Sequence, residues 1–264
     1  MDNKELLNKF NEMAKESNSI VFFGGAGVST ESGIPDFRSV DGLYNQKYDY
    51  PPETILSHTF FIKQPSEFYR FYRDKILIDG VEPNITHRKL AELEQAGKLK
   101  AIVTQNIDGL HQKAGSKEVY EVHGTVAKNH CTRCRKFFSG DDVKDLIDAS
   151  LKNPDIAGSS RYIPVCPDCG GIIKPDVVLY EEGLDDYTWN RSVDYIQNAD
   201  MLIVGGTSLV VYPAAGLVNY YRGNRLVLIN KSSTPFDDEA DLVLHMGLGE
   251  VFGQLVLSQG EQSQ

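Results

Sequence analysis

Short apolar runs recur along the chain, and segments with helical spacing of apolar residues separate them. The runs lie at residues 19–23, 100–106, 201–206, 226–230 and 241–246. A helix carrying Leu90 and Leu93 is expected before the second run, capped by Thr86 and ended by Gly97, and another helix is expected at 213–222. Uniformly apolar runs are typical of strands buried on both faces of a sheet. The alternation therefore predicts an α/β fold with a doubly wound parallel sheet.

This alternation stops in two stretches. Residues 39–80 are rich in aromatic side chains with helical spacing, which predicts a helical lid. Residues 128–171 contain all four cysteines and a loop-like stretch between the two pairs, which predicts a small inserted module.

Length and charge narrow the possible functions. A chain of 264 residues, 41% of them apolar, can form one large domain with a smaller module inserted. The 37 acidic and 27 basic side chains give a net charge of −10, which argues against a nucleic-acid partner and suits a cationic substrate. No run reaches the length of a membrane span, and residues 1–19 are polar. We expect a cytoplasmic protein that does not contact a membrane.

The four cysteines form two Cys-x-x-Cys pairs, Cys131 with Cys134 and Cys166 with Cys169. Two such pairs supply the four thiolates of a structural zinc site, and a reducing compartment favours a metal over disulfides. A redox role is the alternative, but it needs only one pair. Because sulfur fills all four positions, the zinc leaves no site for a catalytic water. We expect His130 to be a bystander.

Polar residues follow four of the predicted strands. Gly25-Ala26-Gly27 follows the first, residues 104–109 (TQNIDG) the second and residues 205–208 (GGTS) the third, while Asn230 ends the fourth. Ligands of open α/β sheets bind beyond the carboxyl ends of the strands, so these groups predict one shared crevice for a nucleotide. Capping of a neighbouring helix would explain one such group, but four are hard to explain in that way.

The first glycine loop departs from the usual dinucleotide fingerprint. Thr30 stands where the third glycine is expected, and no strand carries the usual acidic residue about twenty residues on. Pro35-Asp36-Phe37-Arg38 follows instead, which suits a loop that folds over a cofactor that is consumed. His123, in EVHGT, lies at another predicted strand end. A lone histidine is more often structural, but beside Asn106 and Asp108 it is a candidate general base.

These motifs together resemble one family. GAGVSTESGIPDFR, TQNIDGLH, EVHGT, the two cysteine pairs, KPDVVLYEE, GTSLVVYPAA and LIN occur in the order found in sirtuins, the NAD-dependent protein lysine deacylases. The resemblance covers about residues 19–246. It implies a Rossmann-like NAD-binding domain formed by 1–38, 81–127 and 172–264, with a helical part at 39–80 and a zinc-binding module at 128–171. It also implies a deacetylase that moves the acetyl group of acetyl-lysine to ADP-ribose and releases nicotinamide.

The resemblance implies roles for particular residues. His123 is expected to accept a proton from a ribose hydroxyl, while Asn106 and Asp108 complete the catalytic set and Asp108 grips the nicotinamide carboxamide. Phe37 and Arg38 are expected to cover the nicotinamide ribose. The expected NAD contacts are Gly25, Ala26, Gly27, Thr30, Asp36, Phe37, Arg38, Gln105, Asn106, Ile107, Asp108, His123, Gly206, Thr207, Ser208, Asn230 and Lys231.

The acetyl-lysine peptide is expected between residues 177–182 and 210–215, adding a strand to both edges. Its expected contacts are Val177, Val178, Leu179, Tyr180 and Val211. Two residues depart from the family. Gly24 replaces a threonine, which we expect to loosen the strand end. Glu181 replaces a glycine, which we expect to favour basic residues beside the substrate lysine. We expect a monomer.

Other functions are possible on the same residues. ADP-ribosyl transfer begins with the same cleavage of NAD, but the intact His123 favours deacylation. An inactive acyl-lysine reader would be expected to lack His123 or Asn106, and the chain has both. A nicotinamide oxidoreductase is disfavoured by the missing acidic residue and the altered third glycine.

Overall fold

A computed structural model describes residues 2–36, 49–153 and 161–256 of the chain. Its larger sheet has six parallel strands in the order β3-β2-β1-β7-β8-β9, which confirms the predicted α/β fold. The strands are β1 (Ile20–Gly24), β2 (Leu99–Thr104), β3 (Val119–Glu121), β7 (Met201–Gly205), β8 (Leu226–Ile229) and β9 (Leu242–Leu244). The chain order reverses between β1 and β7, the neighbours at the centre of the sheet. In doubly wound sheets this switch point opens the ligand crevice.

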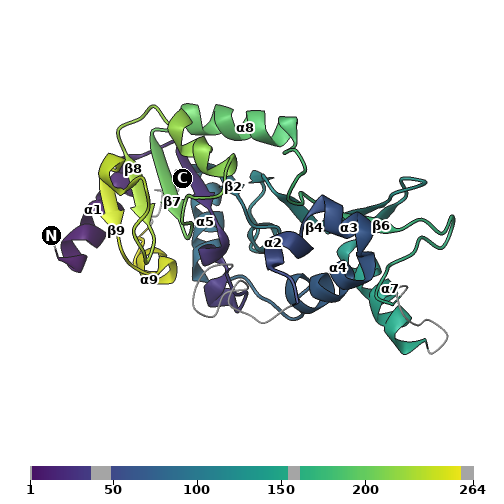
Figure 1. Ribbon diagram of the computed structural model, residues 1–264. Coiled ribbons are helices and arrows are strands. Elements are labelled where there is room, and N and C mark those ends of the chain that lie inside the picture. The colour runs from purple at the N-terminus through teal and green to yellow at the C-terminus, as the bar shows by residue number, and fades with distance from the viewer. Residues whose placement is uncertain (1, 37–48, 154–160, 257–264) are drawn as a thin grey trace, which may run out of the picture.

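Helices cover both faces of this sheet (Figure 1). In β1, Ile20 and Phe22 pack toward one set of helices and Val21 and Phe23 toward the other, and all four side chains are fully buried. The first face is covered by α1 (Asn3–Glu16), α5 (Ile85–Gln95) and α9 (Leu248–Gly253). The second face is covered by α8 (Asp186–Gln197) and the 3₁₀ helix η6 (Ala214–Tyr220). Burial on both faces explains why these strands are apolar throughout.

Two helix details differ from the sequence prediction. The expected helix at 213–222 is the shorter 3₁₀ helix η6. The cap of α5 is Asn84 and not Thr86, because the Asn84 side chain accepts hydrogen bonds from the Thr86 and His87 N–H groups. Asn84 was missed because asparagine and threonine are both good caps and lie two residues apart.

The second part of the molecule contains a small antiparallel sheet in the order β5-β4-β6. Its strands are β4 (Gly124–Cys131), β5 (Phe137–Ser139) and β6 (Ile173–Val177), and α7 (Gly140–Lys152) follows β5. The described part of 39–80 is helical, with α2 (Pro52–Ile55), α3 (His58–Lys63), α4 (Pro65–Phe71) and the π-helical turn η4 (Tyr72–Ile76). The zinc-binding module was expected to span residues 128–171, but β4 begins before that range and β6 lies after it. The module boundaries stay predictions. Among the described helices, none combines the length and apolar character that a membrane crossing requires.

Candidate active site

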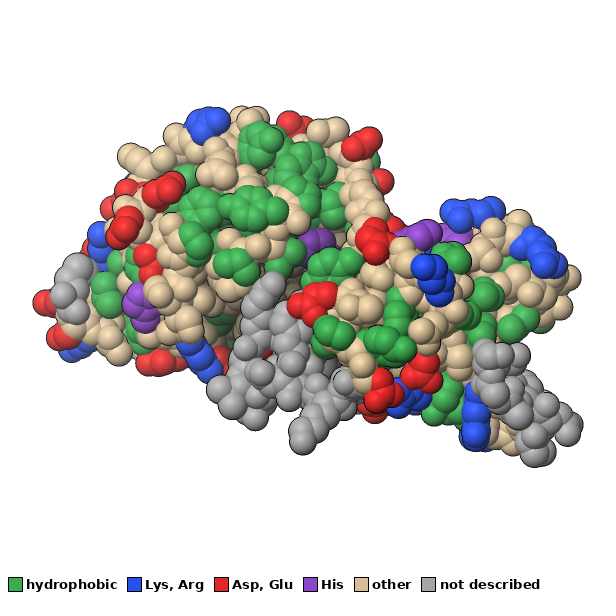
Figure 2. Space-filling model, in the orientation of Figure 1, with side chains coloured by type: hydrophobic (Ala, Val, Ile, Leu, Met, Phe, Trp, Pro, Cys, Tyr) green, Lys and Arg blue, Asp and Glu red, His purple; other side chains and the backbone are tan. Residues whose placement is uncertain are grey.

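A crevice of about 730 Å³ lies at the carboxyl ends of the parallel strands, at the switch point between β1 and β7. Its walls come from the strand-end loops, from η4 and from the segment that follows β6. Figure 2 shows a hollow between the larger and smaller parts of the molecule, with hydrophobic side chains gathered beside it. A cavity of this size suits a dinucleotide-sized ligand.

The glycines after β1 allow two strand-end loops to touch. The Gly25 N–H donates to the Gly205 carbonyl oxygen at 3.2 Å, and the Gly27 N–H donates to the Gly206 carbonyl oxygen at 2.8 Å. A Cβ on Gly27 would lie 2.9 Å from that Gly206 oxygen, which is too close for any larger residue. Of the predicted glycine motif, Ala26 and Gly27 line the crevice, whereas Gly25 does not and packs against Thr207.

Ser29 connects the first loop to the second. Its hydroxyl donates to Asp108 Oδ2 at 2.7 Å and accepts from Asn106 Nδ2 at 3.0 Å. The other Asp108 oxygen accepts from the Leu110 N–H at 2.9 Å. Burial raises the pKa of Asp108, and these two hydrogen bonds oppose the shift. The sequence predicted Asn106 and Asp108 but not Ser29. Residues 29–32 (STES) contain three hydroxyl side chains, and nothing in the sequence shows which of them faces Asp108.

His123 follows β3 and lines the crevice. Its Nδ1 lies 3.1 Å from the Gln105 carbonyl oxygen. A carbonyl oxygen can only accept, so Nδ1 carries the hydrogen and Nε2 keeps its lone pair. Burial is the main influence on the pKa of His123 and lowers it, which keeps the ring neutral near pH 7. This tautomer and charge are those that a general base needs.

The other predicted cofactor contacts also gather around the crevice. Gln105 donates from Nε2 to Thr207 Oγ1 at 3.1 Å and so joins the loops after β2 and β7. Phe37 and Arg38 lie outside the described residues. The remaining predicted residues on the crevice wall are Thr30, Asp36, Ile107, Gly206, Ser208, Asn230 and Lys231.

All five predicted substrate contacts line the same crevice: Val177, Val178, Leu179, Tyr180 and Val211. The Val178 N–H donates to the His123 carbonyl oxygen at 2.9 Å, and the Tyr180 N–H donates to the Leu56 carbonyl oxygen at 3.0 Å. The Leu179 N–H donates to the Glu182 carboxylate at 2.9 Å. The segment after β6 is thus held beside His123, and the expected strand addition by a peptide stays a prediction.

The structure shows what the residues at both departures from the family pattern contact. Glu181 has a φ of 77°, a conformation that favours glycine, and its carboxylate accepts from the Thr59 N–H at 2.9 Å. Its charge therefore lies at the start of α3. Gly24 remains in β1, and a Cβ there would lie 2.7 Å from Cε1 of Phe22. The large ring of Phe22 occupies the space that a larger residue would need.

The residues after β9 also line the crevice and were not predicted. Met246, Gly247 and Leu248 form part of its wall. The rule that ligands bind at strand ends applies to the last strand as well, so it could have found them. Glu31 was missed too; it lines the crevice and accepts from the Gly249 N–H at 3.0 Å, which ties the first loop to α9.

The four cysteine sulfurs form one cluster away from the crevice, with all four atoms within 4.8 Å of one another. The Sγ atoms of Cys131 and Cys169 are 3.4 Å apart, and those of Cys134 and Cys166 are 3.7 Å apart. Tetrahedral zinc with bonds of about 2.3 Å places its sulfurs roughly 3.8 Å apart. The cluster therefore fits structural zinc. His130 is not part of it, and its Nδ1 lies 2.8 Å from Asp176.

Comparison with known proteins agrees with this geometry. A model of the Sir2 family matches residues 25–213. The chain belongs to the Sir2 family. A relative from Clostridium acetobutylicum, named NAD-dependent protein deacetylase, is 57% identical over 256 residues, which are 95% of this chain and 99% of the relative. A Clostridium perfringens protein of the same name is 55% identical over 259 residues, which are 97% of this chain and 100% of that relative.

Solved Sir2 structures share the fold. A Sir2 complex with a p53 peptide and NAD⁺ has a TM-score of 0.79 at 39% identity, covering 94% of this chain and 96% of that chain. A second Sir2 structure contains a deacetylated p53 peptide and 3′-O-acetyl ADP-ribose. It has a TM-score of 0.83 at 37% identity, with the same two coverages of 94% and 96%.

Proposed function

We propose that this chain is an NAD-dependent protein lysine deacetylase, which transfers the acetyl group of acetyl-lysine to ADP-ribose and releases nicotinamide. The observation that carries the proposal is His123, whose Nδ1 is held by the Gln105 carbonyl so that Nε2 can accept a proton in the crevice. Family membership and the shared name of the two Clostridium relatives support the same activity.

The close contact between two glycine loops of the crevice suits the pyrophosphate of NAD. The contact between Gly27 and Gly206 brings two loops together with no side chain between them, which lets a pyrophosphate approach the backbone. We infer that Ala26, Gly27, Thr207 and Ser208 lie along the phosphates and that Asn230 and Lys231 contact the adenosine half. Gln105, Ile107 and Asp108 would surround the nicotinamide, with Asp36 nearby. When bound, NAD supplies the ADP-ribose that accepts the acetyl group.

The chain's own groups have distinct tasks in this reaction. Asp108 can accept the N–H of the nicotinamide carboxamide, and the Ser29 hydroxyl fixes the direction of its carboxylate. His123 Nε2 accepts a proton from a ribose hydroxyl, and the Gln105 carbonyl then stabilises the proton on Nδ1. Asn106 is held by Ser29 and faces the same space. Ile107 and Val178 line the same space and place apolar surface beside the reacting atoms.

Acyl-lysine peptides are the substrates that suit the outer crevice. Other Sir2 structures contain acetylated and propionylated peptides. We infer that a peptide lies between the segment after β6 and residues 210–215, with its modified lysine directed toward His123. We also infer a monomer in the cytoplasm, where a reducing medium keeps the four cysteines available to zinc, and the net charge of −10 disfavours nucleic acid.

The test is to incubate the purified protein with NAD and an acetyl-lysine peptide, using the same peptide without the acetyl group as the control. Deacetylation predicts nicotinamide release that depends on the acetyl group, together with a peptide that loses one acetyl mass. If nicotinamide release does not need the acetyl group and a protein gains ADP-ribose, the activity is ADP-ribosyl transfer and the proposal is wrong.

A further inference from the structure

The π-helical turn η4 forms the wall between two cavities. Tyr72, Lys75 and Ile76 line the active-site crevice. Arg73 and Leu77, from the same short stretch, line a second cavity of about 540 Å³ on the other side. Because neighbouring residues of one turn face opposite cavities, a contact made in the second cavity can set the shape of the crevice.

Tyr72 forms a buried part of the crevice wall. Its side chain is only 1% exposed and stacks on Phe68, with ring centroids 5.6 Å apart. It packs in one apolar cluster with Val177 and Leu179 of the expected peptide segment. Its buried hydroxyl has no hydrogen-bond partner among the residues that the structure describes. Since buried hydroxyls are nearly always paired, a polar atom of a ligand is a suitable partner.

The π-helical form of this turn needs support from outside. π-Helical turns are rare and less favourable than α-helix, and they are frequent at functional sites. Within the turn, the Leu77 N–H donates to the Tyr72 carbonyl oxygen at 2.9 Å. Conformations of this kind persist where the surrounding contacts hold them. Arg73 provides these contacts.

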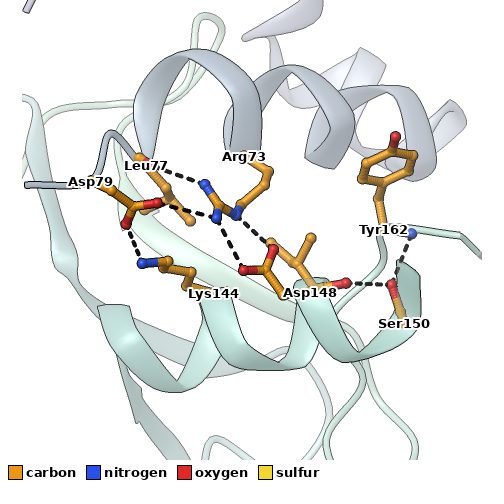
Figure 3. Close-up of polar contacts among 8 residues, drawn as sticks. Arg73, Leu77, Asp79, Lys144, Asp148, Ser150 and Tyr162 are labelled. Carbon is orange, nitrogen blue, oxygen red and sulfur yellow. Dashed lines mark hydrogen bonds and ion pairs between the residues drawn. The ribbon is translucent and has the colours of Figure 1, made fainter. Parts of the chain in front are cut away.

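The Arg73 guanidinium joins the turn to α7 of the cysteine module (Figure 3). Its Nε donates to Asp148 Oδ1 at 2.7 Å and its Nη2 to Asp148 Oδ2 at 3.0 Å, which is a two-pronged contact. Its Nη1 donates to the Leu77 carbonyl oxygen at 3.2 Å, so it also holds the end of the turn. Asp79 accepts from Arg73 at 3.3 Å and from Lys144, one turn before Asp148 on α7. One side chain thus fixes both the form of the turn and its place against α7.

The α7 side of this contact is firmly anchored. Ser139 caps α7 by accepting from the Asp142 N–H, and Val143 and Ile147 are fully buried beneath it. Lysine could not replace Arg73 fully, because an ammonium lacks the planar fork that matches a carboxylate. The contact therefore depends on a guanidinium at 73 and a carboxylate at 148.

We propose that Arg73 is a positioning residue for acyl-chain selectivity: by fixing η4 against α7, it sets where Tyr72, Lys75 and Ile76 meet the acyl group. This inference rests on the proposed deacetylase function. When the contact is weakened, the turn relaxes toward α-helical geometry, which rotates Lys75 and Ile76 relative to Tyr72. The reshaped wall then discriminates differently among acyl groups of different length.

The test compares kcat/KM for one peptide that carries acetyl-, propionyl- or butyryl-lysine, with saturating NAD. We expect Arg73→Lys and Asp148→Asn each to change the acetyl-to-butyryl ratio by about 3- to 20-fold. Asp148→Glu, which keeps the carboxylate, should change the ratio less. Arg70→Gln is the matched control, because Arg70 lines the same second cavity but pairs within α4, at 2.7 Å from Glu67. It should leave the ratio unchanged.

Two further readouts separate selectivity from folding. The KM for NAD and the melting temperature of Arg73→Lys should stay close to the values of Arg70→Gln. If Arg73→Lys and Asp148→Asn lower kcat/KM for all three acyl groups by one factor, or if Arg70→Gln changes the ratio equally, the inference is wrong while the deacetylase function stands. A parent protein that removes no acyl group with NAD would overturn the proposed function itself, and the selectivity role with it.

Discussion

A buried histidine pair supports the cofactor loop and should make the fold sensitive to acid. His87 and His111 are almost fully buried, and their ring centroids lie 4.7 Å apart. His87 Nδ1 accepts from the Asn84 N–H at 3.3 Å, and Asn84 Nδ2 donates to the Val28 carbonyl oxygen at 2.7 Å, directly behind the loop after β1. Burial, with a smaller contribution from Arg88, lowers the pKa of His87 from 6.5 to about 4.

The size of the effect follows from these two pKa values. The unfolded chain binds a proton on His87 near pH 6.5, whereas the folded chain binds it only near pH 4. The stabilisation by neutral His87 is therefore complete above pH 6.5 and is lost as the pH falls toward 4. One pKa unit corresponds to about 1.4 kcal/mol, so the drop from pH 7 to pH 5 should remove about 2 kcal/mol through His87 alone. Burial also lowers the pKa of His111, which acts in the same direction.

The variant His87→Gln separates the contribution of His87 to the pH dependence of stability from the contributions of other titrating groups. Burial raises the pKa of Glu121 to about 7, so Glu121 stabilises the fold as the pH falls and opposes the loss from His87 in the parent protein. Glutamine at this position can still bond to the Asn84 N–H as part of a capping box, but it does not titrate. Urea unfolding at pH 7 and pH 5 measures the difference in unfolding free energy between parent and variant.

We expect the variant to be less stable than the parent at pH 7, and the gap to shrink by about 2 kcal/mol at pH 5. A gap that is the same at both pH values would show that His87 titrates normally in the folded state and would refute the argument.

Three further predictions concern the metal, the crevice and the acyl group. Cys134→Ala should lose bound zinc and melt at a lower temperature, because binding energy at a structural zinc site is folding energy; an unchanged melting curve in a metal-free protein would contradict this. Ser29→Ala should slow nicotinamide release about tenfold, since Asp108 Oδ2 loses its hydrogen bond and only Oδ1 stays held, by the Leu110 N–H; a rate near that of the parent would contradict the link. The parent should prefer acetyl- to succinyl-lysine, because Lys75 lies 3.1 Å from Asp74 and lacks the fork of an arginine, and Lys75→Arg should raise succinyl turnover. Faster succinyl than acetyl removal by the parent would show that Lys75 anchors the carboxylate.

The large sheet could be predicted because both of its faces are buried. That burial makes strands such as β1 and β7 apolar throughout, which is visible in the sequence. The small sheet was not predicted, because β4 has half-buried and exposed residues along much of its length and β6 contains Pro175. Such strands depend on their partners and on the neighbouring cysteine cluster more than on their own pattern.

Site residues could be predicted where a polar or titratable side chain follows the end of a predicted strand, as at Asn106, Asp108 and His123. Local sequence could not show which nitrogen of His123 faces the crevice, because the Gln105 carbonyl that decides it lies 18 residues earlier. It also could not show that Arg73 meets Asp148, since these residues are 75 positions apart and each would be unremarkable on a helix surface. Contacts of this kind depend on how the parts of the fold pack together.

The most direct test of the central claim is the initial rate of NAD-dependent deacetylation of an acetyl-lysine peptide by His123→Ala beside the parent protein, with NAD affinity measured by calorimetry. A general base contributes about 10²–10⁴-fold to rate, so we expect a loss in that range with NAD affinity and melting temperature nearly unchanged. A variant that releases nicotinamide and deacetylates the peptide within a few-fold of the parent rate would contradict the assignment of His123 Nε2 as the base.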